Sequence, residues 1–143
     1  MTDHGPEIPD GFVPANFSRG FLDHSGPYYL KAGQGGPIVG CRILPQHMNY
    51  IGSAHGGVLA TLADVALSLA VYVSETPNRP VSTVTMSTSF LSAARLGEWI
   101  EAVGTIDRIG ATLAYTHGSI SCAGRTLMTM SAVFNIIRPK KQT

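Results

Sequence analysis

One long apolar stretch with a single carboxylate most constrains how this chain can fold. Residues 58–73 contain no proline or glycine, and four of them are alanine. This composition favours a helix, and apolar residues on every side of it are typical of a helix enclosed by protein. The stretch is shorter than the ~20 residues that a bilayer requires and carries Asp64 near its centre, so a transmembrane span is not expected. We predict a buried helix that ends near Glu75, before Pro77.

Polar residues form one seam along this helix. Thr61, Asp64 and Ser68 follow the spacing i, i+3, i+7, and Gly57 lies two turns before Asp64, so all four share one face. Gly56 and Gly57 leave the first N–H groups unshielded, at the end where the helix dipole favours negative charge. The helix therefore offers an oxyanion site and a carboxylate. The alternative is that Asp64 is a hydrogen-bonded core residue and that the glycines only pack the helix end.

Length and charge limit the classes of protein to consider. The 143 residues predict one domain, and only 13% are charged, against a usual ~25%. Because so few charged residues are available to cover the surface, we expect a homo-oligomer in which part of that surface is buried between chains. The formal net charge of +1 gives no long-range attraction for nucleic acid.

The N-terminus and the cysteines predict the compartment. Residues 1–7 contain neither a basic segment nor an apolar signal core, so we expect a cytoplasmic protein. Cys41 and Cys122 lie far apart without a neighbouring ligand set. We therefore expect two reduced, buried thiols and no metal or redox site.

The rest of the chain is predicted as strands around the helix. The expected strands are residues 28–31, 38–44, 81–91, 99–108, 112–122 and 126–137. Short connections join the last four, which indicates an antiparallel sheet wrapped around one helix, an α+β fold. We expect residues 1–27 to form an N-terminal arm with a short helix within 16–24, residues 28–138 the domain, and residues 139–143 a tail.

Strict alternation in the strand after the helix predicts which side chains share a face. One set is Val84, Met86, Thr88 and Phe90, and the other is Thr83, Thr85, Ser87 and Ser89.

A spaced motif at the helix start resembles a known family. It consists of Asn49-x-x-Gly52-x-x-His55-Gly56-Gly57, followed after six intervening residues by Asp64. The later runs 96–98 and 108–116 are also in the family style. On these motifs, from about residue 38 to residue 137, the chain resembles the hotdog-fold acyl-CoA thioesterases of the phenylacetate-degradation type. The resemblance implies a hotdog fold, with an antiparallel sheet around one long central helix.

The resemblance also implies catalytic roles for four residues. Asp64 would activate a water or attack the thioester directly, and either role requires an ionised group beside the carbonyl. The backbone N–H of Gly56 would polarise that carbonyl, and the Asn49 side chain would orient substrate or water. Thr83 matches the position of a Ser or Thr that positions the nucleophilic water.

Further implied contacts concern the substrate and a second chain. The implied binding residues are His55, Gly57, Arg108, Gly110 and Arg125, with His55 interpreted mainly as an anchor of its loop. Arg108 and Arg125 are candidates for the nucleotide phosphates, although both are equally suited to solvated turns. No cofactor or metal is implied, because coenzyme A is part of the substrate.

The family also implies a homodimer, which would pair into a dimer of dimers. Each of its sites would combine Asn49 and Gly56 of one chain with Asp64 and Thr83 of the other. The identity of the acyl group stays open. Candidates to line a pocket for an aromatic or medium-chain acyl group are Met48, Tyr72, Met86 and Phe90.

Two other functions stay open. A hotdog-fold enoyl-CoA hydratase or dehydratase would use Asp64 as acid with His55 or His47 as base. A non-catalytic acyl-CoA-binding protein would bind the same ligand without turnover.

Overall fold

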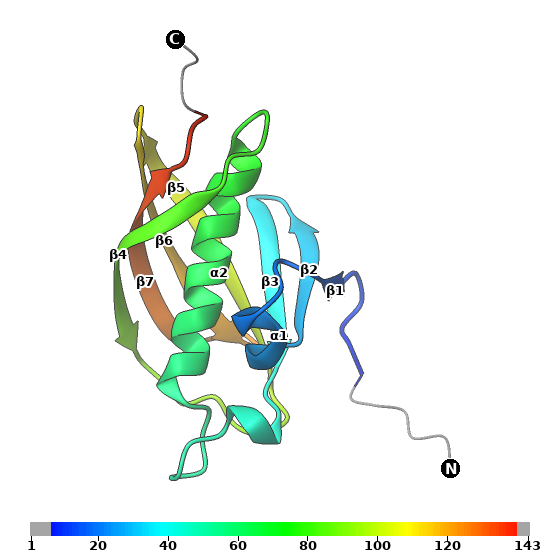
Figure 1. Ribbon diagram of the computed structural model, residues 1–143. Helices are drawn as coiled ribbons and strands as arrows, with labels where there is room; N and C mark the ends of the chain where they lie inside the picture. The colour runs from blue at the N-terminus through cyan, green and yellow to red at the C-terminus, as the bar shows by residue number, and fades with distance from the viewer. Residues whose placement is uncertain (1–6, 140–143) are drawn as a thin grey trace.

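A seven-stranded antiparallel sheet wraps around one long helix in the computed structural model, which describes residues 7–139 (Figure 1). The strand order is β1-β2-β3-β5-β6-β7-β4. The elements are β1 (Val13–Ala15), α1 (Phe21–Ser25), β2 (Tyr28–Gly33), β3 (Gly36–Arg42), the 3-10 turn η1 (Pro45–His47), α2 (Gly56–Ser74), β4 (Val81–Phe90), β5 (Trp99–Ile109), β6 (Leu113–Cys122) and β7 (Arg125–Ile136). The predicted arrangement of an antiparallel sheet around one helix is confirmed.

Helix α2 begins two residues before the predicted start at Val58. Its N-cap is His55, whose ring Nδ1 accepts the N–H of Gly57 at 2.9 Å, so the first turn starts at Gly56. By length and composition α2 could cross a membrane, but the sheet wraps it and it is the core helix of this fold. Its enclosure is one-sided in the single chain: Tyr72 and Val73 stay 41% and 47% exposed.

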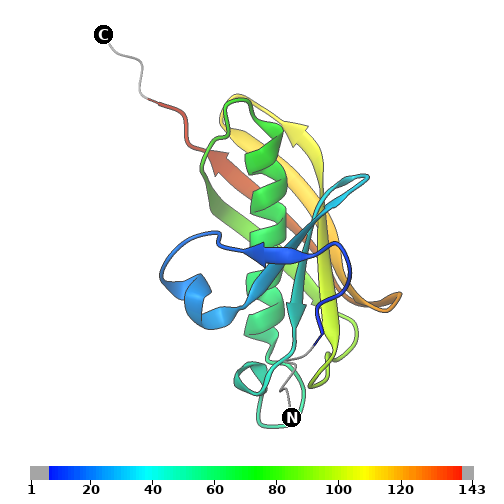
Figure 2. The ribbon, with the colours of Figure 1, turned by 90° about the vertical axis from the view of Figure 1, so that its right-hand side faces the viewer.

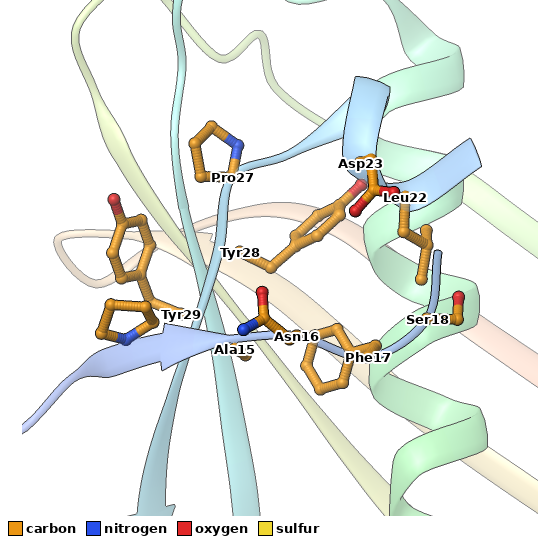
Figure 3. A pocket seen from close by; sticks show the side chains of 10 residues that line it. Ala15, Asn16, Phe17, Ser18, Leu22, Asp23, Pro27, Tyr28 and Tyr29 are labelled. Carbon is orange, nitrogen blue, oxygen red and sulfur yellow. The ribbon is translucent and has the colours of Figure 1, made fainter. Parts of the chain in front are cut away.

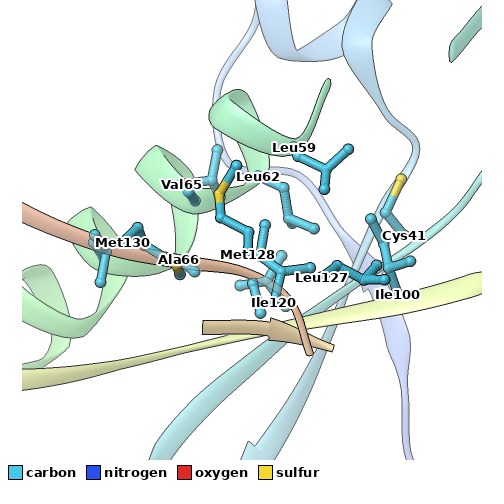
Figure 4. Close-up of a cluster of buried hydrophobic side chains, with 14 of the residues drawn as sticks. Cys41, Leu59, Leu62, Val65, Ala66, Ile100, Ile120, Leu127, Met128 and Met130 are labelled. Carbon is cyan, nitrogen blue, oxygen red and sulfur yellow. The ribbon is translucent and has the colours of Figure 1, made fainter. Parts of the chain in front are cut away.

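The core lies between α2 and the concave side of the sheet. Figure 4 shows aliphatic and sulfur-containing side chains from α2, β3, β5, β6 and β7 in contact there. Leu62 and Leu67 of α2 are fully buried, as are Ile100, Ile120 and Leu127 of the sheet. Each such side chain contributes roughly 1.5–3 kcal/mol to the stability of the fold when it is buried. Together these contacts hold α2 in a fixed position against the strands.

Close packing in the sheet under α2 depends on Gly118, which gives a testable expectation. A Cβ on Gly118 would lie 2.1 Å from the carbonyl oxygen of Val103 and 3.1 Å from Leu67. That oxygen belongs to the neighbouring strand and cannot move without disturbing the ladder. We expect Gly118→Ala to lower the free energy of unfolding by ~1–3 kcal/mol in urea denaturation. Gly35→Ala is the control, because nothing lies within 4 Å of its Cβ; equal stability of both variants would contradict the packing.

The N-terminal segment differs from the predicted arm. β1 pairs with β2 in the register Val13↔Leu30, so the sheet begins inside residues 1–27. A three-residue strand containing Pro14 shows no alternation, and proline is tolerated there because β1 is an edge strand. The predicted short helix forms later, at Phe21–Ser25, and Figures 1 and 2 together place it on the side of α2 away from the sheet. Residues 1–6 and 140–143, part of the predicted arm and tail, lie outside the described residues.

A β-bulge in β4 overturns the predicted alternation. The register with β7 runs Thr83↔Phe134 and then Thr85↔Val133, so Val84 is the extra residue and is 59% exposed. Thr83 and Met86, predicted on opposite faces, therefore both face α2. Serine and threonine occupy both faces of this strand, so its composition gave no signal for the bulge.

Candidate active site

The central feature of the site is the carboxylate of Asp64, halfway along α2. Thr83 of β4 donates its hydroxyl to Asp64 Oδ1 at 2.5 Å. Among residues 7–139 no group donates a hydrogen bond to Oδ2, and Asp64 is only half-buried. One oxygen is thus held by the protein and the other is available to water or substrate. Both residues are predicted site residues, and the bulged register of β4 places Thr83 on the face of the strand that meets Asp64.

Asp64 faces a hollow between α2, α1 and β4. Among the eight lining residues Asp64 is the one charged side chain; the others include Leu22, Thr61, Ser68 and Met86. The hydroxyls of Thr61 and Ser68 donate to helix carbonyls, at 2.8 Å and 3.0 Å, and so do not compete for the carboxylate. An acceptor-only group in a largely apolar hollow is suited to take a proton from water or to attack an electrophilic carbon.

The start of α2 supplies an unused donor. The N–H of Gly57 goes to His55 Nδ1 at 2.9 Å, and the N–H of Val58 goes to His55 O at 2.9 Å. Within the described part of the chain, the N–H of Gly56 has no acceptor. A Cβ at Gly56 would lie 3.3 Å from the Phe90 ring, so a side chain there would push against that ring. A free N–H at the positive end of the helix dipole can stabilise an oxyanion.

Asn49 holds its own loop together. Its Oδ1 accepts the N–H groups of Ile51 and Ser53, both at 3.0 Å, and its Nδ2 donates to Ser53 Oγ at 3.0 Å. One amide hydrogen stays available for a further partner. The loop leads directly into Gly56, so Asn49 positions the donor at the helix start. The contact with Ser53 was not predicted, because the position of an asparagine in a turn does not report whether its side chain faces a ligand or its own loop.

The two histidines considered as bases both have structural roles. His47 is 2% exposed; its Nδ1 accepts the Leu44 N–H at 2.9 Å, and its Nε2 lies 2.8 Å from the carbonyl oxygen of Ser25. Both of its nitrogens are therefore engaged. His55 caps α2, in agreement with its interpretation as a loop anchor. The geometry thus favours the carboxylate over either histidine as the reacting group.

The two halves of the site do not meet within one chain. Gly56 and Asp64 are eight residues apart on the same helix, which separates them by ~12 Å along the axis. A single carbonyl cannot contact both groups at once. Either only one of them acts, or a second chain supplies the missing half.

The residues expected to bind the nucleotide part of the substrate have different surroundings. Arg125 is engaged: its guanidinium donates to Ser92 Oγ at 2.7 Å, to Ala93 O at 2.9 Å and to Glu98 Oε2 at 2.8 Å. Arg108 is exposed near the end of β5 and makes no side-chain hydrogen bond among the described residues. The N–H of Gly110 closes the β5–β6 turn by donating to Leu113 O at 2.7 Å.

Glu98 is the centre of a small network that sequence analysis did not assign. The hydrogen bond from the Cys122 thiol lowers the pKa of the Glu98 carboxyl, and the donors of Arg95 and Arg125 add to this against the effect of burial. The network fixes the loop before β5. Neither cysteine is a nucleophile candidate, because burial raises the pKa of Cys41 to about 12 and also raises that of Cys122. The described residues contain no cluster of metal ligands.

A sheet wrapped around one helix, with an accessible carboxylate at mid-helix and a free N–H at the helix start, defines the class of hotdog-fold hydrolases. The model of the thioesterase superfamily matches residues 51–131, more than half of the chain. The chain therefore belongs to the thioesterase superfamily, and it is a thioester hydrolase.

Individual relatives agree with this assignment. A Pseudomonas aeruginosa protein that carries the name esterase is 35% identical to this chain. The match covers 90% of this chain and 97% of the relative's chain. Human acyl-coenzyme A thioesterase 13 is 34% identical over 61% of each chain. A hypothetical thioesterase protein of Streptococcus pneumoniae, solved with coenzyme A, has a TM-score of 0.70 and 25% identity, and the match covers 80% of this chain and 91% of the other.

Proposed function

We propose that this protein hydrolyses acyl-CoA thioesters to a free acid and coenzyme A. The observation that carries the proposal is the Asp64 carboxylate, held by Thr83 through one oxygen and open to a hollow through the other. The names of the human relative and of the pneumococcal structure, the second solved with coenzyme A, support acyl-CoA as the substrate class.

The chemistry follows from the two unused groups. Asp64 takes a proton from water while the water oxygen attacks the thioester carbon, or the carboxylate attacks that carbon itself. A Gly56 N–H stabilises the oxygen that becomes negative. The C–S bond then breaks and the coenzyme A thiolate leaves. In the first route it takes back the proton that Asp64 accepted from water. In the second route the acyl group stays on Asp64 as a mixed anhydride, and water hydrolyses it to the free acid, restores the carboxylate and supplies the proton for the thiolate. Thr83 keeps the carboxylate oriented in either route.

A homodimer with shared sites completes this arrangement. β4 is an edge strand of ten residues, and within the described part of the chain it pairs with β7 alone, which leaves its other edge unpaired there. Long free edges are normally covered. Antiparallel pairing of two β4 edges across a twofold axis would place the two α2 helices antiparallel, with Gly56 and Asn49 of one chain toward Asp64 and Thr83 of the other. We further propose that two such dimers associate into a dimer of dimers.

Several finer assignments belong to the same proposal. Arg108, which makes no side-chain hydrogen bond within residues 7–139, is the better of the two arginines to meet the nucleotide phosphates, because Arg125 is held by its loop. His55, Gly57 and Gly110 shape the substrate path through backbone geometry. The cytoplasmic location, the independence from cofactors and metals, and the lack of membrane or nucleic-acid partners stay predictions.

A panel of acyl-CoAs tests the function. We expect thiol release from saturated acyl-CoAs in metal-free buffer, with kcat in the range of roughly 1–10³ s⁻¹ that is typical of enzymes. Enoyl-CoAs in the same panel are expected to lose the acyl group rather than to gain water across the double bond. Hydration without thiol release would establish the hydratase alternative, and tight binding without turnover the non-catalytic one.

A further inference from the structure

The hollow at Asp64 continues along α2 into a second, larger one. Leu22, Val65 and Ser68 line both, so the two share a wall and form one groove. The second hollow, of about 540 Å³, extends past Ser68 to Tyr72 of α2 and Val81 of β4. This groove, from Asp64 to Tyr72, lies on the side of α2 that the sheet leaves uncovered.

The second hollow is suited to hydrocarbon. None of its ten lining residues is charged, and those with polar side-chain groups are Asn16, Ser18, Ser68 and Tyr72. The hydroxyl of Ser68 is already used, because it donates to Val65 O at 3.0 Å. A charged group in this hollow would lose part of its hydration without gaining an oppositely charged partner among the lining residues, whereas methylenes would leave water favourably.

The length of the groove sets the length of chain that it can hold. Asp64 and Tyr72 are eight residues apart on α2, or ~12 Å along its axis. An extended hydrocarbon advances about 1.3 Å per carbon, given C–C bonds of ~1.5 Å in a zigzag. Eight to ten carbons therefore span the distance, whereas an aromatic acyl group fills only the part beside Asp64.

The outer wall of the groove is the segment of residues 16–22. Phe17 and Leu22 from this segment pack against the core side chains. On its other side, next to Tyr28, lies a separate hollow of about 190 Å³, which Figure 3 shows with Phe17 and Leu22 at its border. That hollow does not include Asp64, so the groove along α2 is the one continuous with the catalytic carboxylate.

We propose that this groove binds a straight acyl chain of about eight to ten carbons and that Ser68 sets how far the chain can reach. The inference rests on the proposed thioesterase function and adds its substrate class. Ser68 is a specificity residue, because its small side chain leaves the passage between the two hollows open.

The substrate test uses unmodified protein with saturated acyl-CoAs from two to sixteen carbons, phenylacetyl-CoA and octanedioyl-CoA. We expect kcat/KM to rise by up to roughly four-fold per added methylene and to level off near eight to ten carbons. Octanedioyl-CoA should react at least ~10-fold more slowly than octanoyl-CoA, because its terminal carboxylate would lose hydration in a hollow that has no positively charged side chain. A flat profile, or a preference for phenylacetyl-CoA, would overturn the groove assignment. Absence of turnover with every member would instead remove the proposed function.

A plug in the passage tests the role of Ser68. Ser68→Phe is expected to lower kcat/KM for decanoyl-CoA by ~10–100-fold. Because Ser68 also lines the hollow at Asp64, kcat/KM for butanoyl-CoA should fall as well, but by a factor at least ~10-fold smaller. Ser74→Phe is the matched control, since Ser74 also donates to a helix carbonyl, Val71 O at 2.7 Å, but is exposed and lines neither hollow. If the Phe variant unfolds, Ser68→Leu gives the same test, because the smaller leucine side chain would also narrow the passage between the two hollows. Equal losses for both substrates would exclude Ser68 as the residue that sets chain length.

Discussion

Asp64→Asn is expected to abolish nearly all thioester hydrolysis while the protein stays folded. Asparagine has the shape of aspartate, and its side-chain oxygen can still accept the Thr83 hydroxyl that Oδ1 accepts at 2.5 Å. The amide cannot take up a proton or attack a carbonyl, so the loss should be ~10²–10⁴-fold in kcat. The free energy of unfolding should change by less than ~1 kcal/mol, because Asp64 is half-buried and keeps its hydrogen bond.

The measurement is thiol release with the native and variant proteins at equal concentration, together with urea denaturation of both. Asp10→Asn is the matched control, because Asp10 is exposed and precedes β1, which lies at the opposite edge of the sheet from β4. It should retain full activity. If Asp64→Asn kept its activity, the carboxylate would have no part in the reaction; if it lost stability instead, Asp64 would be the hydrogen-bonded core residue considered from the sequence.

Local patterns were enough to predict the helix and most of the sheet. The run 58–73 has no helix breaker, and glycine-containing turns separate the last three strands, so α2 and six of the seven strands could be placed without tertiary information. β1 could not, because three residues with a proline show no period. Its place is determined by pairing with β2, a tertiary contact that no local pattern in residues 13–15 reports.

The site shows the same division between local and long-range information. The spacing of Gly56 and Asp64 on one helix was legible, because both belong to one element with a fixed period. The contact of Asp64 with Thr83 depends on where β4 lies against α2, and no spacing reports that. The involvement of Asn49 in its own loop was also hidden, since an asparagine side chain can face a ligand or its own backbone with equal ease.

Hybrid dimers provide the sharpest test of the shared site, because they should regain activity from two inactive parents. Asp64→Asn removes the reacting group. Asn49→Ala removes the three side-chain hydrogen bonds that hold the loop before Gly56, so it should misplace the N–H donor. In a mixed dimer with shared sites, one site receives the intact Asp64 and the intact loop, and the other site receives both defects.

Random exchange of equal amounts makes half of the dimers mixed, so about a quarter of all sites should become native. Activity should thus rise from near zero to about 25% of the native value, with chains carrying different affinity tags to prove exchange. If Gly56, Asn49 and Asp64 served a site within one chain, every chain in the mixture would still carry a defect and no activity would return. The separation of ~12 Å between Gly56 and Asp64 along α2 favours recovery, because within one chain the Gly56 N–H is too far from the carbonyl that Asp64 faces.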